Sequence, residues 1–319
     1  MRIRLIKKVV FFSILTLILV LINSWLDRGG AQHIRLQYDE TFHPKVNADM
    51  VIMGASHAAH GINPKYFERD GLKVFNFAQD GAGPLYFLEW YRKIFQRYYR
   101  KPDTVIYGVH WAMFGENLGR RLENDSRYFP RDFLFKEFRD LKTMTSLIMN
   151  RIPLIRNRKM LIYRLDELLD KLQKRKHRTR TFYVQTSYYN GFVPYERKGR
   201  LDRVKSSKPQ ISKASISAFE DLLDEFKKDK VEVIFVHIPG NLSSRDPSHI
   251  QEGIQLLNEI AEKRKILFLD YETERITNIN TDPSMFSDWI HLNEKGSIAF
   301  SKLLRSDLDS LLKQRTAKD

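Results

Sequence analysis

The chain contains no cysteine among its 319 residues. This absence excludes disulfide-stabilised scaffolds, cysteine-based zinc sites and cysteine nucleophiles, although it does not indicate a compartment. Acidic residues are the minority charge, with 39 Asp and Glu against 54 Lys and Arg, so the formal net charge is +15. The mean hydropathy of −0.44 excludes a protein with many membrane spans. Because 42% of the residues are hydrophobic, a disordered chain is also excluded. The length suits one large domain, or one domain with an insertion.

The N-terminus joins a basic flank to an apolar run. Residues 1–8 include four basic side chains, and the 18 residues at 9–26 carry no charge. A helix of that length covers about 27 Å, enough for the apolar core of a bilayer. We therefore expect a cytoplasmic tail, a single transmembrane anchor at 9–26, a linker at 27–47 and an extracytoplasmic domain at 48–319. A cleaved signal peptide is the alternative, although Gly29-Gly30-Ala31 makes a poor cleavage site.

Short apolar segments alternate with longer amphipathic segments in the rest of the chain. Strands are expected at Met50–Met53, Val74–Ala78, Thr104–Val109, Val231–Ile238 and Ile266–Tyr271. Helices are expected at Leu85–Tyr99, Ser215–Lys228, Pro247–Lys263 and Glu294–Lys313. This alternation predicts an α/β fold, a three-layer αβα sandwich with a roughly five-stranded parallel sheet of flavodoxin-like type, preceded by one transmembrane helix. Because ligands of such sheets bind beyond the carboxyl ends of the strands, functional residues are expected in the loops that follow them.

A basic insertion interrupts the alternation at about 116–212. Residues 151–213 hold 18 Lys and Arg against 5 Asp and Glu, a net charge of +13. An extracytoplasmic location argues against nucleic acid as the partner of this region. We therefore expect an anionic lipid or an anionic envelope polymer to bind it. A solvated basic face with a disordered loop is the alternative.

Two distant motifs are suited to nucleophilic catalysis. Gly54-Ala55-Ser56-His57 follows the first expected strand, where a serine would be exposed and backbone N–H groups could face an oxyanion. Asp288 and His291 lie three residues apart before the last expected helix. This spacing lets the carboxylate orient one imidazole nitrogen while the other faces the serine, whose hydroxyl needs a base. We therefore predict Ser56, His291 and Asp288 as catalytic residues, with helix capping as the alternative for the serine and the aspartate.

With these motifs in this order, the sequence resembles the SGNH (GDSL-like) hydrolase superfamily. That family carries its nucleophilic serine in a G-x-S motif after the first strand and its base in a D-x-x-H motif near the C-terminus. Gly54–Ser56 and Asp288–His291 match both motifs. The resemblance covers residues 48–115 and 230–312 and leaves the insertion uncovered.

The resemblance also implies the donors of an oxyanion hole. Gly81, which follows the second expected strand, corresponds to the family's backbone N–H donor, and the backbone N–H of His57 is expected beside it. The family usually has an asparagine in a G-x-N motif after the third strand. This chain has Gly108-Val109-His110, so the ring of His110 is expected to donate instead, with a missing third donor as the alternative.

Other polar residues are assigned from their positions. His237 and Asn241 follow the fourth expected strand and are predicted to contact substrate, with a structural hydrogen bond as the alternative for the histidine. His60 and His249 are expected in loops or on the surface. Because no H-x-x-x-H or H-E-x-x-H pair occurs, we predict no metal site. Triad chemistry needs no cofactor, and we predict none.

A membrane-anchored domain of this superfamily resembles its envelope acyl-transfer members, which include polysaccharide O-acetyltransferases and the D-alanyl-transfer protein of teichoic acid synthesis. The resemblance implies O-acylation, such as O-acetylation, of a cell-envelope polysaccharide through an acyl-Ser56 intermediate. The implied partners are an acyl donor, an envelope glycan acceptor and a multi-span membrane acyltransferase. Two alternatives remain: a plain carbohydrate esterase or deacetylase, and a non-catalytic binding or assembly protein.

Overall fold

The computed structural model describes residues 2–28, 46–69, 71–115, 122, 125, 188–195, 210–242 and 247–316. The chain divides into two compact units, one of residues 1–35 and 123–180 and one of residues 36–122 and 181–319.

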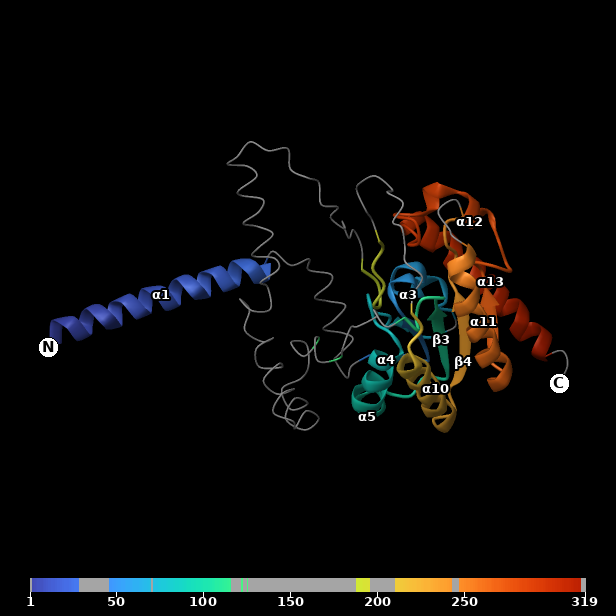
Figure 1. Cartoon of the computed structure of the whole chain (residues 1–319), viewed down its shortest axis with the longest axis horizontal. Coiled ribbons are helices and arrows are strands. Elements are labelled where there is room, and N and C mark those ends of the chain that lie inside the picture. The colour runs from blue at the N-terminus through green and yellow to red at the C-terminus, as the bar shows by residue number, and fades with distance from the viewer. Residues whose placement is uncertain are drawn as a thin grey trace. The chain divides into compact units, whose positions relative to one another are not determined.

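The described part of the first unit is mainly α1, which runs from Arg2 to Arg28 (Figure 1). Large apolar side chains between Ile6 and Leu21 are exposed along this helix. Among the residues that the structure describes, no helix combines the length and apolar character that a bilayer crossing requires. The helix predicted at 9–26 is therefore present, while its predicted membrane span is not shown.

The second unit is built on a parallel sheet of five strands in the order β2-β1-β3-β4-β5. The strands are β1 (Met50–Gly54), β2 (Val74–Asn76), β3 (Thr104–Val109), β4 (Glu232–His237) and β5 (Leu267–Asp270). The central strands are buried along nearly their whole length, as expected for apolar runs covered on both faces. The predicted α/β architecture with five parallel strands is confirmed.

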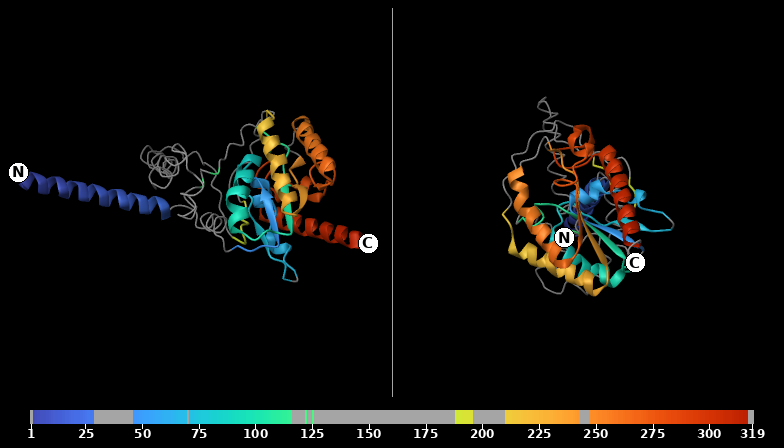
Figure 2. Two further views of the ribbon diagram at one scale, coloured as in Figure 1. Left: turned by 90° about the horizontal axis from the view of Figure 1, so that it is seen from below. Right: turned by 90° about the vertical axis from the view of Figure 1, so that its right-hand side faces the viewer.

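Helices cover both faces of the sheet (Figure 2). On one face α3 (Ser56–Gly61) packs against α13 (Glu294–Thr316). Elsewhere α4 (Pro84–Trp90) packs against α10 (Lys213–Lys228), which lies beside α11 (Pro247–Arg264). Shorter elements complete the unit: η1 (Pro64–Tyr66), η2 (Tyr91–Phe95), α5 (Gln96–Tyr98), α12 (Asn278–Thr281) and η5 (Pro283–Met285).

The helices form where the sequence supplies an apolar stripe and a cap. In α10 the buried side chains recur every three or four residues, as in Phe219, Leu222 and Phe226. The Ser212 side chain accepts a hydrogen bond from the Ser215 N–H and so caps the helix. Each buried leucine or phenylalanine contributes about 2 kcal/mol by leaving water.

Part of the expected insertion returns to the sheet. Residues 188–195 are described, and the N–H of Asn76 at the end of β2 donates to the carbonyl of Asn190. The remainder of the insertion, apart from Leu122, Asp125 and residues 210–212, lies outside the described residues. The predicted binding of an anionic lipid or polymer falls on that part.

Candidate active site

Ser56 is the first residue of α3, directly beyond the carboxyl end of β1. Two glycines paired across β1 and β3, Gly54 and Gly108, allow the helix to approach the sheet closely. A Cβ atom on Gly108 would lie 2.5 Å from the Ala58 Cβ, and one on Gly54 would lie 2.4 Å from the Gly108 carbonyl oxygen. Gly54 also has a φ of +133°, which side-chain-bearing residues rarely adopt. The two glycines therefore fix the position of the serine.

A continuous set of hydrogen bonds joins the three predicted catalytic side chains. The Ser56 Oγ lies 2.8 Å from the His291 Nε2, and the His291 Nδ1 lies 2.8 Å from the Asp288 Oδ2. These residues are 235 positions apart in sequence at their widest separation. The arrangement can remove the hydroxyl proton of the serine and stabilise the imidazolium that results.

The loop before α13 is wrapped around the Asp288 carboxylate. Its Oδ1 accepts the backbone N–H groups of Ile290 at 2.9 Å and His291 at 2.7 Å. Burial alone would raise the pKa of Asp288, but the bonds to His291 and to these N–H groups lower it below the usual value. The carboxylate therefore stays ionised and holds the imidazole in one orientation.

His110 and His57 form a stacked pair next to the triad. Their ring centroids are 3.9 Å apart with an interplanar angle of 23°, and the His57 ring lies 4.9 Å from that of His291. The Nδ1 of His110 accepts the N–H of Ala112 at 3.2 Å, which places the ring proton on Nε2. Burial, together with the neighbouring histidines, holds the pKa of both rings well below the usual value, so both are neutral. Within the described residues, the His110 Nε2 and both ring nitrogens of His57 have no hydrogen-bond partner.

Gly81 lies in an exposed turn after β2 with a φ of +68°. The same loop is tied to the nucleophile strand, because the Gln79 N–H donates to the Gly54 carbonyl at 3.0 Å. The role of the glycine as an oxyanion donor stays a prediction.

The prediction that His237 and Asn241 contact substrate conflicts with their burial. The His237 side chain is fully buried, and its Nδ1 lies 2.9 Å from an Asp270 oxygen while its Nε2 lies 2.9 Å from a Glu272 oxygen. Asn241 is 2% exposed. Because β4 and β5 are adjacent in the sheet, carboxylates at the end of β5 occupy both nitrogens of the histidine. The structural alternative for His237 is therefore the one that the structure supports.

These two carboxylates set the charge of His237. Burial alone would lower the pKa of the imidazole, but Glu272 and Asp270 raise it to about 9. Burial would likewise raise the pKa of Asp270, whereas the histidine and Thr273 lower it to about 2. A buried cation flanked by two carboxylates thus lies under the site.

The prediction of a loop or surface position for His60 is wrong. His60 is 3% exposed and lies on α3, four residues after Ser56 and so on the same helix face. Sequence reasoning also missed Asn76, whose buried amide donates to the carbonyls of Ala58 and Ile62 at 2.9 Å and so ties α3 to β2. The spacing of four residues between Ser56 and His60 was the one available signal for the histidine.

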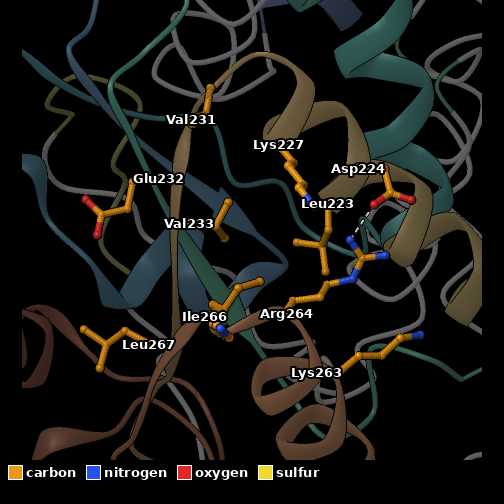
Figure 3. Close-up of a pocket in the computed structure, with 11 residues that line it drawn as sticks. Leu223, Asp224, Lys227, Val231, Glu232, Val233, Lys263, Arg264, Ile266 and Leu267 are labelled. Atoms are coloured by element: carbon orange, nitrogen blue, oxygen red, sulfur yellow. Dashed lines mark hydrogen bonds and ion pairs between the residues drawn. The ribbon is translucent and has the colours of Figure 1, made fainter.

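A hollow at the opposite edge of the sheet is separate from this site. It has a volume of about 720 Å³ and lies between the C-terminal ends of α10 and α11, beside the first residues of β4 and β5 (Figure 3). Arg264 reaches across it to Asp224 at 2.6 Å. Because ligands of parallel sheets bind at the carboxyl ends of the strands, this hollow is not part of the catalytic arrangement. Within the described ranges, no group of three His, Asp or Glu side chains is placed to hold a metal ion.

Comparisons with known proteins found one matching family model and several similar solved structures. A family model described as DltD protein matches residues 123–306, more than half of the chain, including Asp288 and His291. No curated protein sequence matches. Similar solved structures include a GDSL-like lipase of Bacteroides thetaiotaomicron, which is 11% identical, with 82% of this chain and 88% of that chain covered and a TM-score of 0.39. Another is a lipase/acylhydrolase of Enterococcus faecalis, 12% identical, with 82% and 95% covered and a TM-score of 0.41.

Proposed function

The chain belongs to the DltD protein family, and we propose that it transfers acyl groups through an acyl-Ser56 intermediate to hydroxyl groups of a cell-envelope polysaccharide. The observation that carries this proposal is the hydrogen-bonded series Ser56–His291–Asp288 at the carboxyl end of a parallel sheet. This arrangement serves acyl transfer and ester hydrolysis alike, and the identity of the second nucleophile separates them.

The reaction would proceed in two half-reactions. In the first, the His291 Nε2 accepts the proton of the Ser56 hydroxyl as the Oγ attacks the carbonyl carbon of the acyl donor. The tetrahedral intermediate collapses, the bond to the donor's oxygen breaks, and the imidazolium returns the proton to that oxygen. In the second, His291 accepts a proton from an acceptor hydroxyl, which attacks the acyl-serine, and the proton returns to the Ser56 Oγ.

Oxyanion stabilisation is assigned to three donors. The backbone N–H groups of His57 and Gly81 are two of them, as the resemblance implies. The third is the His110 ring, because its Nδ1 already accepts a backbone N–H and its Nε2 therefore carries the proton. The low pKa of this ring supports the assignment, since a neutral donor does not titrate in the working pH range.

The test uses the full chain in detergent with p-nitrophenyl acetate as donor and methyl glycosides as acceptors. We expect a fluorophosphonate to label the wild type and Ser310→Ala, and to fail on Ser56→Ala and His291→Ala. Ser310 is a matched control because its hydroxyl only contacts the Ser306 carbonyl on the surface of α13. Acetylated glycoside detected by mass spectrometry supports transfer, whereas acetate alone supports an esterase. A folded wild type that is not labelled and does not turn over p-nitrophenyl acetate would contradict the proposal.

We also propose that the protein acts outside the cytoplasm in association with a membrane. The basic residues in the first turns of α1 and the exposed apolar side chains that follow them support this location. A multi-span membrane acyltransferase would deliver the acyl group, and the basic insertion would contact anionic lipid or polymer. Carbonate extraction of membranes tests the association, because a chain that begins at residue 46 should appear in the soluble fraction and the full chain should not. Co-purification from cross-linked membranes tests the acyltransferase partner.

A further inference from the structure

His60 is a buried titratable residue next to the triad that the proposed reaction does not use. Its ring lies edge-on to that of His291, with centroids 6.2 Å apart at 81°. It is held by groups from two other parts of the chain. The His60 Nδ1 lies 2.7 Å from the Val193 carbonyl oxygen, and its Nε2 lies 2.8 Å from the Asp80 Oδ1.

Both partners of His60 are acceptors, which fixes its protonation. A backbone carbonyl and a carboxylate have no proton to donate, so each ring nitrogen must carry one when both bonds are made. Only the imidazolium satisfies this condition. Burial opposes the charge, but Asp80, the Val193 carbonyl and Asp288 together raise the pKa of His60 above its usual value. Among the described residues, the titratable groups that face it are Asp80 on the β2–α4 loop, Asp288 and His291 before α13, His57 on α3, and Tyr195.

Val193 belongs to Tyr188–Tyr195, which we name the wall segment. Its first half is docked on β2 and on the loop after η1, since the Asn190 side chain donates to Glu68 at 2.8 Å and its carbonyl accepts from the Asn76 N–H at 2.8 Å. Gly191 passes so close that a Cβ there would lie 1.9 Å from the Asn76 oxygen. This end of the wall segment is therefore fixed independently of the histidine.

The second half of the wall segment places an aromatic ring against the catalytic base. The Tyr195 ring lies 4.6 Å from the His291 ring at 40° and 4.7 Å from the His60 ring. Its carbonyl accepts a hydrogen bond from the Ser287 hydroxyl, next to Asp288. Tyr195 is 7% exposed, so the ring is packed in place. It thus forms one side of the space around His291.

We propose that His60, as an imidazolium, is a positioning residue that fastens the wall segment beside His291, so that Tyr195 bounds the space in which the acyl acceptor meets the catalytic base. The part that concerns the acceptor rests on the proposed function. The fastening itself does not, because it follows from the bonds to Val193 and Asp80. A neutral imidazole has one N–H, which stays on Nε2 because the hydrogen bond to the Asp80 carboxylate is the stronger one, so the bond to the Val193 carbonyl is lost. The wall segment should therefore loosen as the pH rises through the pKa of His60.

The first experiment measures the fastening without reference to activity. Hydrogen exchange of a peptide that covers the wall segment is followed by mass spectrometry in the full chain between pH 5.5 and 9.5, with rates corrected for intrinsic exchange. We expect protection at low pH and its loss as the pH rises. Asp80→Asn should abolish this loss, because the asparagine amide can donate to an unprotonated Nε2 and leaves the Nδ1–H of the neutral ring for the Val193 carbonyl. Asp221→Asn, which alters an exposed carboxylate on α10, is the matched control and should behave as the wild type.

The second experiment measures the consequence for the reaction. We expect His60→Gln to raise the KM for the glycoside acceptor about tenfold or more, the loss expected for one hydrogen bond to a charged group. Fluorophosphonate labelling of Ser56 should change less than about threefold, because the triad bonds do not include His60. Asp80→Asn should remove the alkaline loss that belongs to His60 from the acceptor pH profile, because its neutral ring can keep both hydrogen bonds.

The outcomes separate the two proposals. Wall-segment protection that responds to pH and to Asp80→Asn, in a protein without any transfer activity, supports the fastening and contradicts the proposed function. Active enzyme in which Asp80→Asn leaves both protection and the alkaline limb unchanged overturns the fastening. If His60→Gln does not fold, Asp80→Asn alone decides, since it leaves every residue of α3 in place.

Discussion

Replacing His237 by glutamine tests the buried ionic group beneath the site. The variant leaves the Asp270 and Glu272 carboxylates buried without the cation between them. Removal of one partner from a buried ion pair costs about 3–5 kcal/mol, because the remaining charge is desolvated and uncompensated. We therefore expect His237→Gln to lower the free energy of unfolding by about that amount at pH 6.5. The double variant His237→Gln/Glu272→Gln should recover part of the loss, because it removes one of the two facing carboxylates.

The same ionic group makes the stability of the wild type depend on pH. The pKa of His237 is about 9 in the folded protein and 6.5, the ordinary histidine value, in the unfolded chain. Since the folded value is raised, the contribution to stability is complete below pH 6.5 and is lost as the pH rises towards 9. Each pKa unit corresponds to about 1.4 kcal/mol, so this contribution is on the order of 3 kcal/mol. The pKa of His60 is also raised, so this residue adds a further loss of stability as the pH rises.

Urea unfolding at pH 6.5 and pH 9, followed by tryptophan fluorescence, measures both the loss of stability in His237→Gln and the pH dependence of stability in the wild type. The decisive comparison is the difference in stability between the two pH values for the wild type, for His237→Gln and for Asp221→Asn as an exposed control. His237→Gln should lose most of the wild-type difference and Asp221→Asn should keep it. A His237→Gln variant that unfolds within about 1 kcal/mol of the wild type and keeps the full pH dependence would refute a charged His237.

Three further predictions concern the catalytic end of the sheet. His110→Ala should lower kcat for p-nitrophenyl acetate by about 100-fold or more, the usual effect of losing one oxyanion donor. His110→Asn should keep kcat within about tenfold of the wild type, because its amide can still donate. Equal losses of kcat in both variants would exclude donation by the ring. Gly108→Ala should destabilise the protein by about 1–3 kcal/mol in thermal unfolding, because its new Cβ would lie 2.5 Å from that of Ala58. Asn76→Leu should lower both stability and turnover, because the carbonyls of Ala58 in α3 and of Ile62 directly after it lose their buried donor. Unchanged turnover would show that this tie does not position Ser56.

The strands could be predicted because burial on both faces leaves a strong local signature. Thr104–Val109 is apolar and β-branched almost throughout, and it forms the central strand β3. The motifs at Ser56 and at Asp288–His291 could be placed for a related reason. Each lies where an element ends, and the topology of a parallel sheet brings the carboxyl ends of its strands to one edge.

The environments of the other histidines could not be predicted, because their partners are distant in sequence. Asp270 lies 33 residues from His237, and only the pairing of β4 with β5 brings the two together. Val193 lies 133 residues from His60 and comes from within the basic insertion. No local pattern marks either pair. Composition alone cannot separate a histidine that contacts substrate from one that two carboxylates enclose.

The partners of each imidazole divide the histidines of this site into three electrostatic kinds. His291 has a carboxylate on one nitrogen and a hydroxyl on the other, and this asymmetry allows it to accept a proton from one side only. His57 and His110 have no carboxylate against their rings and are neutral through burial.

His60 and His237 have acceptors on both sides and are cations. Asp80 and Asp270 stabilise the two cations at contact distance. Removing either carboxylate should therefore lower the pH at which its histidine loses the charge, and so change the pH dependence of stability more than removing an exposed carboxylate does.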